Sequence, residues 1–319
     1  MVAELNQTVA AWLADAAPPS WLQVVVVPPC DRLDLVGSWA RGRGHRVLGP
    51  PPGPMFDAFE VPAPEGLEGD GLLVVPRLER WFLRHRNGLA PVRALLARLC
   101  GLERHCLVGC DSWAWAFLVK AVGARMMLPE PLTFTPFDGA CLRRWFGELV
   151  ADRTDASPTF RLAHTGDDVM ACDDEDRPHH GHLDQLAARS LGIPWVAWHS
   201  WRASLRVSTH CDEQVSERAR AAMAGDARTF WVVEPNDFVV PRHHEDRALL
   251  VLQALLLHGG LTGERLADVL PATGEPDVVH ALRSAGFVER DEGLLRIRAA
   301  AYPTVRRALQ TDGYPLGAM

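Results

Sequence analysis

The polar residues best placed to do chemistry follow two short apolar runs, Leu72–Val75 and Cys106–Cys110. Apolar runs of this length without alternation are typical of strands buried on both faces, and such strands belong to parallel sheets. A helix-patterned segment separates the runs, so we expect a strand–helix–strand unit with a right-handed crossover. The residues after the two strands, Pro76–Glu79 and Asp111–Trp113, should then meet at one sheet edge, where a ligand would bind.

The chain contains one lysine, Lys120, and its other basic residues are arginines. A loop that holds nucleotide phosphates needs a Gly-Lys-Ser/Thr sequence between a strand and a helix. The lysine then contacts the phosphates and the hydroxyl holds magnesium. Lys120 stands between Val119 and Ala121, in the segment after Trp113–Leu118. It cannot take that role, so the sequence excludes a standard phosphate loop.

The composition is that of an ordinary soluble protein, with 48% hydrophobic and 23% charged residues. A chain of 319 residues exceeds the usual domain of ~100–150 residues, so we predict two or three modules. No apolar run reaches the ~18 residues of a membrane span, and Met1–Val27 lacks the features of a secretory signal. We therefore expect a cytoplasmic protein without membrane insertion. The seven cysteines indicate reduced thiols, and the net charge of −7 argues against broad nucleic-acid binding.

The elements that should position the polar residues lie in residues 1–150, which we predict to be an α/β core. Strands are predicted at Trp21–Val27, at His45–Leu48, at the two apolar runs, and within Arg125–Leu128 and Leu132–Phe134. Helices are predicted at Met1–Ala17, at Arg32–Arg41, between the two apolar runs and at Phe137–Val150. About five strands that alternate with helices predict a three-layer, mostly parallel sheet.

Residues 151–182 break this pattern, because they carry many charges and few apolar side chains. We predict an acidic, histidine-rich linker or insertion there. A helical pattern returns in residues 183–240, where Trp195, Trp198 and Trp201 recur at a spacing that places them on one helical face.

Residues 241–319 predict three helices followed by a two-stranded hairpin and a closing helix. The segments are Glu245–His258, Gly263–Leu270 with Thr262 as its cap, Glu275–Ser284, a hairpin that turns at Asp291–Gly293, and Tyr302–Leu309. This is the order of a winged helix.

In its order of modules the chain resembles AAA+ and STAND-type P-loop ATPases. The resemblance covers most of the chain and implies a P-loop NTPase-like core in 1–150, a helical lid in 183–240 and a winged helix in 241–319. In that family the first strand leads into the phosphate loop, whereas here Val24–Val27 leads into PPCDRLDLVGSW, which lacks the lysine. Arg77 and Glu79 follow Leu72–Val75, where the family has its second acidic motif.

The resemblance also implies residues for a nucleotide pocket. Asp111 and Ser112 suit the polar end of the next strand, and Arg202 or Arg206 would correspond to the phosphate-sensing arginine of the lid. Backbone amides at the start of the helix near Arg32, together with several arginines, would hold phosphate. The candidate pocket residues are Arg32, Arg77, Glu79, Asp111, Ser112 and Arg202.

The residues of the family that this chain lacks are the ones that carry out the ATPase reaction. Without the lysine and the aspartate, electrostatic stabilisation of a transferring phosphoryl group is largely absent. We therefore expect a non-catalytic regulatory or scaffold protein that binds a protein partner, with no catalytic residue, no metal site and no certain cofactor. The first alternative is a switch that binds ATP and magnesium in an unorthodox pocket. If the chain is an enzyme, we expect a weak ATPase.

The second alternative is a DNA-binding transcriptional regulator that acts through the winged helix. Its predicted recognition helix carries Glu275 and Asp277 near its start, and only Arg283 is basic. DNA-binding modules normally show a basic footprint. Residues near the wing offer a modest basic patch: Arg296, Arg298, Arg306 and Arg307. Contact with a protein is favoured over DNA by this charge argument.

Three other groups have a plainer explanation. Cys100, Cys106 and Cys110 do not have a usual zinc spacing, so structural thiols are favoured. His179, His180 and His182, with Asp173, Asp174 and Asp176, form the best metal-like cluster, but a solvated linker is favoured. Ser112 lacks the Gly-x-Ser-x-Gly elbow of a hydrolase nucleophile.

Overall fold

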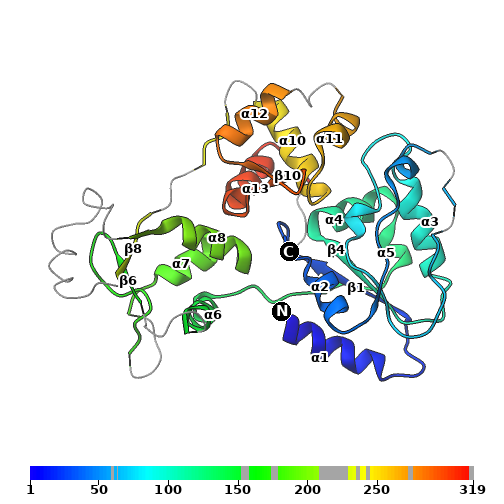
Figure 1. Cartoon of the computed structure of the whole chain (residues 1–319), viewed down its shortest axis with the longest axis horizontal. Helices are drawn as coiled ribbons and strands as arrows, with labels where there is room; N and C mark the ends of the chain where they lie inside the picture. Colours follow the sequence, from blue (N-terminus) through cyan, green and yellow to red (C-terminus); the bar gives the residue numbers. More distant parts are fainter. Residues whose placement is uncertain are drawn as a thin grey trace. The chain divides into compact units, whose positions relative to one another are not determined.

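The chain divides into two compact units (Figure 1). The computed structural model describes residues 1–58, 61–62, 64–151, 158–173, 179–207, 229–234, 238–241, 245–271 and 276–315. The first unit comprises Met1–Thr135 together with Val239–Met319, and the second comprises Pro136–Phe238. The domain boundaries predicted from the sequence, at residues 150, 182 and 240, stay predictions. The observed division joins the two ends of the chain into one unit, a connection that no local sequence pattern indicates.

A five-stranded parallel sheet forms the centre of the first unit, with the strand order β2-β3-β4-β1-β5. Its strands are β1 (Leu22–Val27), β2 (Arg46–Val47), β3 (Leu73–Val75), β4 (Cys106–Asp111) and β5 (Leu132–Thr133). In the register of the sheet, Val27 lies beside Asp111 and Val75 lies beside Val108. The predicted α/β class and the parallel sheet are confirmed. Because β4 lies between β3 and β1, the carboxyl ends of these three strands are neighbours.

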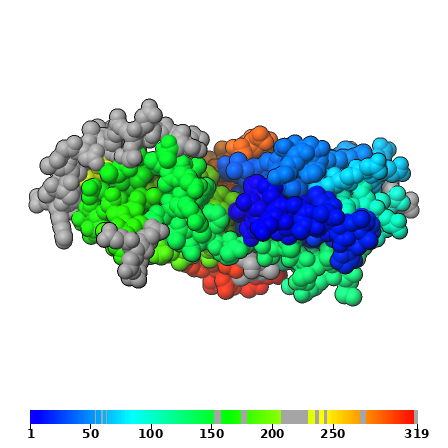
Figure 2. All heavy atoms as spheres, turned by 90° about the horizontal axis from the view of Figure 1, so that it is seen from below, coloured from blue at the N-terminus to red at the C-terminus, as the bar shows by residue number. Residues whose placement is uncertain are grey.

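Helices cover both faces of this sheet. They are α1 (Val2–Leu13), α2 (Leu35–Gly42), α3 (Ala90–Leu99), α4 (Ser112–Ala121) and α5 (Ala124–Met127). The hydrophobic core on one face includes residues of α3, α4 and α5. On the other face Gly109 of β4 leaves room for α2, since a Cβ atom at Gly109 would lie 3.1 Å from Val36 Cγ2. Helix α1 joins that layer through a hydrogen bond from Trp39 Nε1 to Asn6 Oδ1, and it lies at the surface in Figure 2. The result is the three-layer arrangement that the sequence predicted.

Residues 239–319, here called the C-terminal module, complete the first unit. Their elements are α10 (Glu245–Leu257), α11 (Gly263–Val269), α12 (Pro276–Ser284), β9 (Val288–Asp291), β10 (Leu294–Ile297), a 3₁₀ turn (Ala299–Ala301) and α13 (Tyr302–Thr311). The strands β9 and β10 form an antiparallel hairpin. The side chain of Thr262 caps α11 by accepting a hydrogen bond from Arg265 N, as the sequence indicates. Helix α10 is buried along most of its length because it contacts α4 of the core as well as α11, α12 and α13.

In its described residues the second unit has a three-stranded sheet and three helices. Its elements are α6 (Gly139–Ala151), β6 (Thr159–Leu162), α7 (His182–Arg189), α8 (Pro194–Ser204), β7 (Leu205–Val207) and β8 (Thr229–Val232). The strand order is β6-β8-β7, with β6 parallel and β7 antiparallel to β8. Aromatic rings fill the core, where Trp201 lies 5.4 Å from Phe146 and 5.4 Å from Phe160 between ring centroids.

Two sequence predictions differ from these elements. Arg125–Leu128, predicted to contribute to a strand, forms α5 instead, because Gly123 at φ 68 turns the chain into a short helix. Residues 151–182, predicted to be a solvated linker, include β6 and the completely buried Val169. The alternation of Thr159–Leu162 is too short to stand out among the charged residues around it. Asp174 and Asp176 of the predicted metal-like cluster lie outside the described residues.

Candidate functional site

The loop after β1 folds its own carboxylates onto the start of α2. Asp31 accepts hydrogen bonds from Leu33 N at 3.0 Å and Leu35 N at 2.7 Å, and Asp34 accepts one from Gly37 N at 3.2 Å. A Cβ atom at position 37 would lie 2.0 Å from an Asp34 oxygen, so only glycine permits this approach. Two of the first three amides of α2, Leu35 N and Gly37 N, are therefore bound to aspartates, although the sequence predicts that amides near Arg32 hold phosphate.

The residues after β3 form a buried ion pair. Arg77 Nε donates to Glu79 Oε1 at 2.8 Å, and Glu79 Oε2 accepts a hydrogen bond from Asp111 N at 3.1 Å. Glu79 is 3% exposed. Although burial by itself lowers the pKa of Arg77, the Glu79 carboxylate raises it above its ordinary value. Both oxygens of Glu79 are thus used, one within the segment after β3 and the other in joining that segment to the end of β4.

The end of β4 caps the helix that follows it. Asp111 Oδ1 accepts a hydrogen bond from Trp113 N at 2.8 Å, which begins α4. Burial, and then the nearby Glu79 carboxylate, raise the pKa of Asp111 well above its ordinary value. Ser112 is 1% exposed, and its Oγ has no hydrogen-bond partner among the described residues. A buried hydroxyl without a partner carries a desolvation cost.

The C-terminal module lies against this edge of the sheet. A Cβ atom at Gly259, just after α10, would lie 3.1 Å from Arg77 Nη2 and 3.6 Å from Glu79 Oε1. Trp113 Nε1 donates to Tyr302 Oη at 3.1 Å, and Arg32 forms an ion pair with Glu289 of β9. The module therefore covers the carboxyl ends of β1, β3 and β4.

Two further hydrogen bonds hold α10 to the core. Arg84 Nη1 donates to Gln253 Oε1 at 2.9 Å, and Arg84 N donates to His258 Nε2 at 3.4 Å. His258 is 3% exposed, and burial lowers its pKa to about 3, so it is neutral at physiological pH. A neutral imidazole is required here because Nε2 acts as an acceptor.

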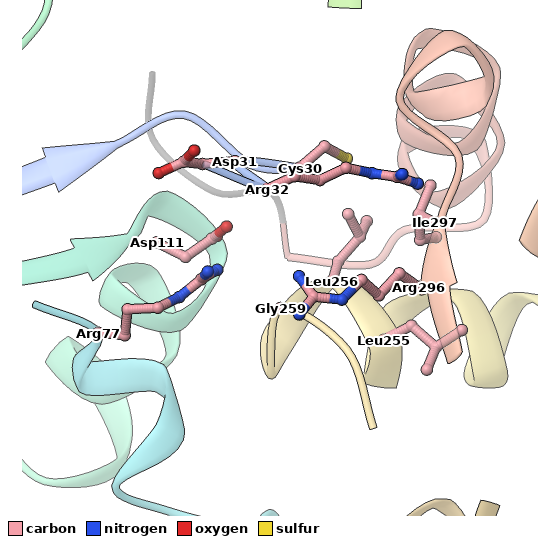
Figure 3. Close-up of a pocket in the computed structure, with 10 residues that line it drawn as sticks. All are labelled: Cys30, Asp31, Arg32, Arg77, Asp111, Leu255, Leu256, Gly259, Arg296 and Ile297. Atoms are coloured by element: carbon pink, nitrogen blue, oxygen red, sulfur yellow. The ribbon is translucent and has the colours of Figure 1, made fainter. Parts of the chain in front are cut away.

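A pocket remains between the sheet edge and the module (Figure 3). It has a volume of about 330 Å³, part of which is open to solvent. Its lining comprises Cys30, Asp31, Arg32, Arg77, Asp111, Leu255, Leu256, Gly259, Arg296 and Ile297. In Figure 3 the guanidinium groups of Arg77 and Arg296 point toward each other across this space. A second hollow, lined by Asp31, Asp34, Glu79, Asp111 and Arg77 among others, lies next to it.

The structure brings most of the predicted pocket residues together. Arg32, Arg77 and Asp111 line the pocket, Glu79 bonds to two of these residues, and Ser112 directly follows Asp111. Arg202 belongs to α8 of the second unit, where its guanidinium carbon lies 5.8 Å from the centroid of the Trp198 ring. Its place in a nucleotide pocket therefore stays a prediction.

Several contributors to the site are not among the residues predicted from the sequence. Asp31 and Asp34 stand before α2, and an Asx residue before a helix is a standard capping signal that could have indicated them. Leu255 and Gly259 belong to a distant segment, and no local pattern in the sequence connects them to the sheet.

The predicted basic patch near the wing takes a different form from the one expected. Arg296 is 8% exposed and faces the pocket instead of solvent. Arg298 Nε lies 3.8 Å from Glu289 Oε2, and so is partly neutralised by the same carboxylate that Arg32 contacts. The surface that remains for DNA phosphates is correspondingly less basic.

The other candidate groups behave in simpler ways. Cys106 and Cys110 are buried on β4, and burial raises the pKa of Cys110 well above its ordinary value. No group of three or more potential metal ligands occurs among the residues that the structure describes. Burial lowers the pKa of His182 to about 4.

Of the helices in the described part of the chain, none is long and apolar enough to cross a membrane.

Solved structures with a similar arrangement share little sequence with this chain. RuvB from Thermotoga maritima is 12% identical over 98% of this chain and 95% of that chain, with a TM-score of 0.34. Orc1 from Aeropyrum pernix, in complex with DNA, is 16% identical over 98% and 92%, with a TM-score of 0.37. Cdc6p from Pyrobaculum aerophilum is 12% identical over 98% and 93%, with a TM-score of 0.28. TM-scores this low carry no argument about function. No protein-family model and no curated protein sequence matches the chain.

Proposed function

We propose that this chain is a non-catalytic regulatory or scaffold protein built on a degenerate AAA+/STAND ATPase-like fold, and that it binds a protein partner. The proposed parts are the α/β core, a lid formed by helices of the second unit, and a winged helix formed by the C-terminal module. The three helices and hairpin of that module support the winged-helix assignment.

One observation carries the proposal: two of the first three amides of α2, Leu35 N and Gly37 N, are already bonded to Asp31 and Asp34. A phosphate loop works because free backbone amides and a lysine surround the phosphates with positive charge. Here carboxylates occupy those amides, and no lysine follows. An incoming phosphate would have to displace the carboxylates and approach their negative charges.

The end of β3 supports the same conclusion. Hydrolysis needs a carboxylate that holds magnesium or orients the attacking water. Glu79, the acidic residue after β3, uses one oxygen for Arg77 and the other for Asp111 N. Neither oxygen is therefore left to bind magnesium or water, and the positive charge of Arg77 beside it disfavours a metal ion.

The C-terminal module favours a protein partner over DNA. Two of the four arginines of the predicted patch near the wing are drawn into contacts within the first unit. Arg296 faces the pocket, and Arg298 lies near Glu289. Helix α12 carries Asp277 in its first turn, and a negative charge close to DNA phosphates disfavours binding.

Purified protein should therefore show neither nucleotide binding nor turnover. We expect the thermal midpoint to stay unchanged with ATP or ADP and magnesium, whereas ligand at ~100 times its Kd would stabilise the native state by about 2.7 kcal/mol. Magnesium-dependent turnover that disappears in Glu79→Gln and persists in Glu130→Gln would overturn the proposal. Glu130 is a suitable control because its side chain is 74% exposed on the same core.

A nucleotide-binding switch is the second candidate, favoured by the convergence of Arg32, Arg77 and Asp111 on one pocket. A midpoint shift with ATP that is absent in Arg77→Gln, without turnover, would establish it. In that case the scaffold proposal fails while the absence of catalysis stands.

A further inference from the structure

Arg77 and Arg296 present two positive charges to the same pocket from different parts of the first unit. Arg77 follows β3 of the core, whereas Arg296 belongs to β10 of the C-terminal module. Figure 3 shows both guanidinium groups directed into the space between them. Two like charges that face each other repel, and the repulsion is strong where water is scarce.

Arg296 lacks the partner that a buried arginine normally has. The residue is 8% exposed, and its Nε has no hydrogen bond in the described part of the chain. The nearest carboxylate, Asp291 Oδ2, lies 3.8 Å from Nε, which is too far for a hydrogen bond. Burial, and then Arg77, lower the pKa of Arg296. A desolvated guanidinium without a bonded anion is costly, so this position favours an added anion.

The charged residues around Arg296 do not supply it with a bonded anion. Arg32 is neutralised by Glu289 and Arg77 Nε by Glu79. Asp31 and Asp111 also line the pocket, but their oxygens already accept backbone hydrogen bonds, Asp31 from Leu33 N and Leu35 N and Asp111 from Trp113 N.

The opposite side of the pocket is apolar. Leu255 and Leu256 of α10 and Ile297 of β10 line it. A ligand with a short hydrocarbon part would bury that part against these side chains, while its charged end meets the arginines.

We propose that this pocket binds a small organic anion, a carboxylate or phosphate ester, whose oxygens bridge Arg77 and Arg296. Planar guanidinium groups are suited to both kinds of oxyanion because each donates parallel hydrogen bonds. The anion needs no lysine, no phosphate loop and no magnesium. It contacts the core and the C-terminal module together, so it holds the module on the sheet edge. The inference rests on the proposed function in one respect, since a regulatory protein needs a signal and this ligand supplies one.

Isothermal titration of the full chain with inorganic phosphate and with succinate, both in EDTA and at constant ionic strength, tests the site. We expect saturable binding of at least one of the two, with one site per chain. The two titrations distinguish a phosphate ester from a carboxylate as the natural ligand. Absence of saturable binding with both probes overturns the proposal.

Variants assign the binding to the two arginines. Arg296→Gln and Arg77→Gln should each weaken binding by about tenfold or more, as expected for loss of a charge-assisted hydrogen bond. Arg290→Gln is the matched control, since Arg290 is an exposed arginine on the adjacent strand β9. Equal affinity in Arg290→Gln and Arg296→Gln would contradict the site.

Hydrogen exchange on the wild-type chain tests the site without relying on variants, which can lose binding because they fail to fold. In the wild-type chain the bound anion should slow amide exchange in residues 255–260 and 294–297, which border the pocket. Binding without this protection would overturn the bridging role. ATP turnover would defeat the proposed function but leave these titrations unaffected, so the two failures are distinguishable.

Discussion

The two units of the chain bury different kinds of side chain. The core of the second unit is aromatic and apolar, with the ring of Trp201 in contact with those of Phe146 and Phe160. The sheet edge of the first unit instead buries charged groups, among them Glu79, Asp111 and Arg296. Apolar burial stabilises a fold directly, whereas buried charges are weak evidence for stability. The comparison separates the apolar cores of both units from the sheet edge of the first unit, where buried charged groups contribute less to stability.

The largest effect is expected in the aromatic core. Phe146→Ala should lower the free energy of unfolding by about 3–5 kcal/mol, because it removes a large side chain and leaves a cavity. Phe146 is 2% exposed and contacts the rings of Trp145, Trp198 and Trp201. Urea unfolding measures the loss, with Phe146→Leu as a milder control. A loss no larger than that of an exposed substitution would mean that this cluster does not carry the stability of the unit.

The next effect tests the buried ion pair. Glu79→Gln should cost about 1.5–3 kcal/mol, because it removes the charge from a hydrogen bond to Arg77 and leaves the guanidinium poorly compensated. Glu130→Gln, an exposed carboxylate, should change stability little. If urea unfolding shows Glu79→Gln to be as stable as the wild type, the charged edge is not held by this pair.

The buried histidine His258 should make the free energy of unfolding depend on pH. The folded-state pKa of His258 is lowered to about 3, below the ordinary 6.5 of the unfolded chain. Its contribution to the free energy of unfolding is therefore fully present above pH 6.5 and is lost as the pH falls toward 3. The loss between pH 6.5 and 5 is about 2 kcal/mol. Asp31 and Asp111 act in the opposite direction, since their pKa values are raised.

A pair of variants isolates the histidine. His258→Gln keeps an acceptor for Arg84 N and should flatten the acid side of the stability curve. His182→Gln in the second unit should flatten it as well, because burial lowers the pKa of His182 to about 4. Denaturation at pH values from 7 to 4 measures both, and an unchanged acid side in either variant would mean that its histidine is not buried in the neutral form.

The smallest effect concerns the contact between core and C-terminal module. Tyr302→Phe removes the acceptor of the Trp113 Nε1 hydrogen bond and should cost about 1 kcal/mol. Tyr302 is 1% exposed, so the substitution leaves its ring packing intact. A loss detected by unfolding together with faster exchange in α13 would confirm that this bond holds the module. No change in either would show that the other contacts suffice.

The sequence by itself determined the strands and helices of the core, because their apolar runs and caps are local signals. It predicted β1, β3 and β4, the helix between the last two, and the meeting of the residues that follow them. It also excluded a phosphate loop through the absence of a suitably placed lysine, a property that no fold changes.

Only the tertiary structure decided what surrounds those residues. Residues 239–319 return to the sheet edge after the second unit, and place Gly259 and Arg296 beside Arg77. That return depends on the burial of α10 between the core and the other helices of its module, a long-range contact that periodicity does not encode. For the same reason Arg296 looked like a surface charge in the sequence and lies buried in the fold, because the burial of a side chain depends on what packs over it.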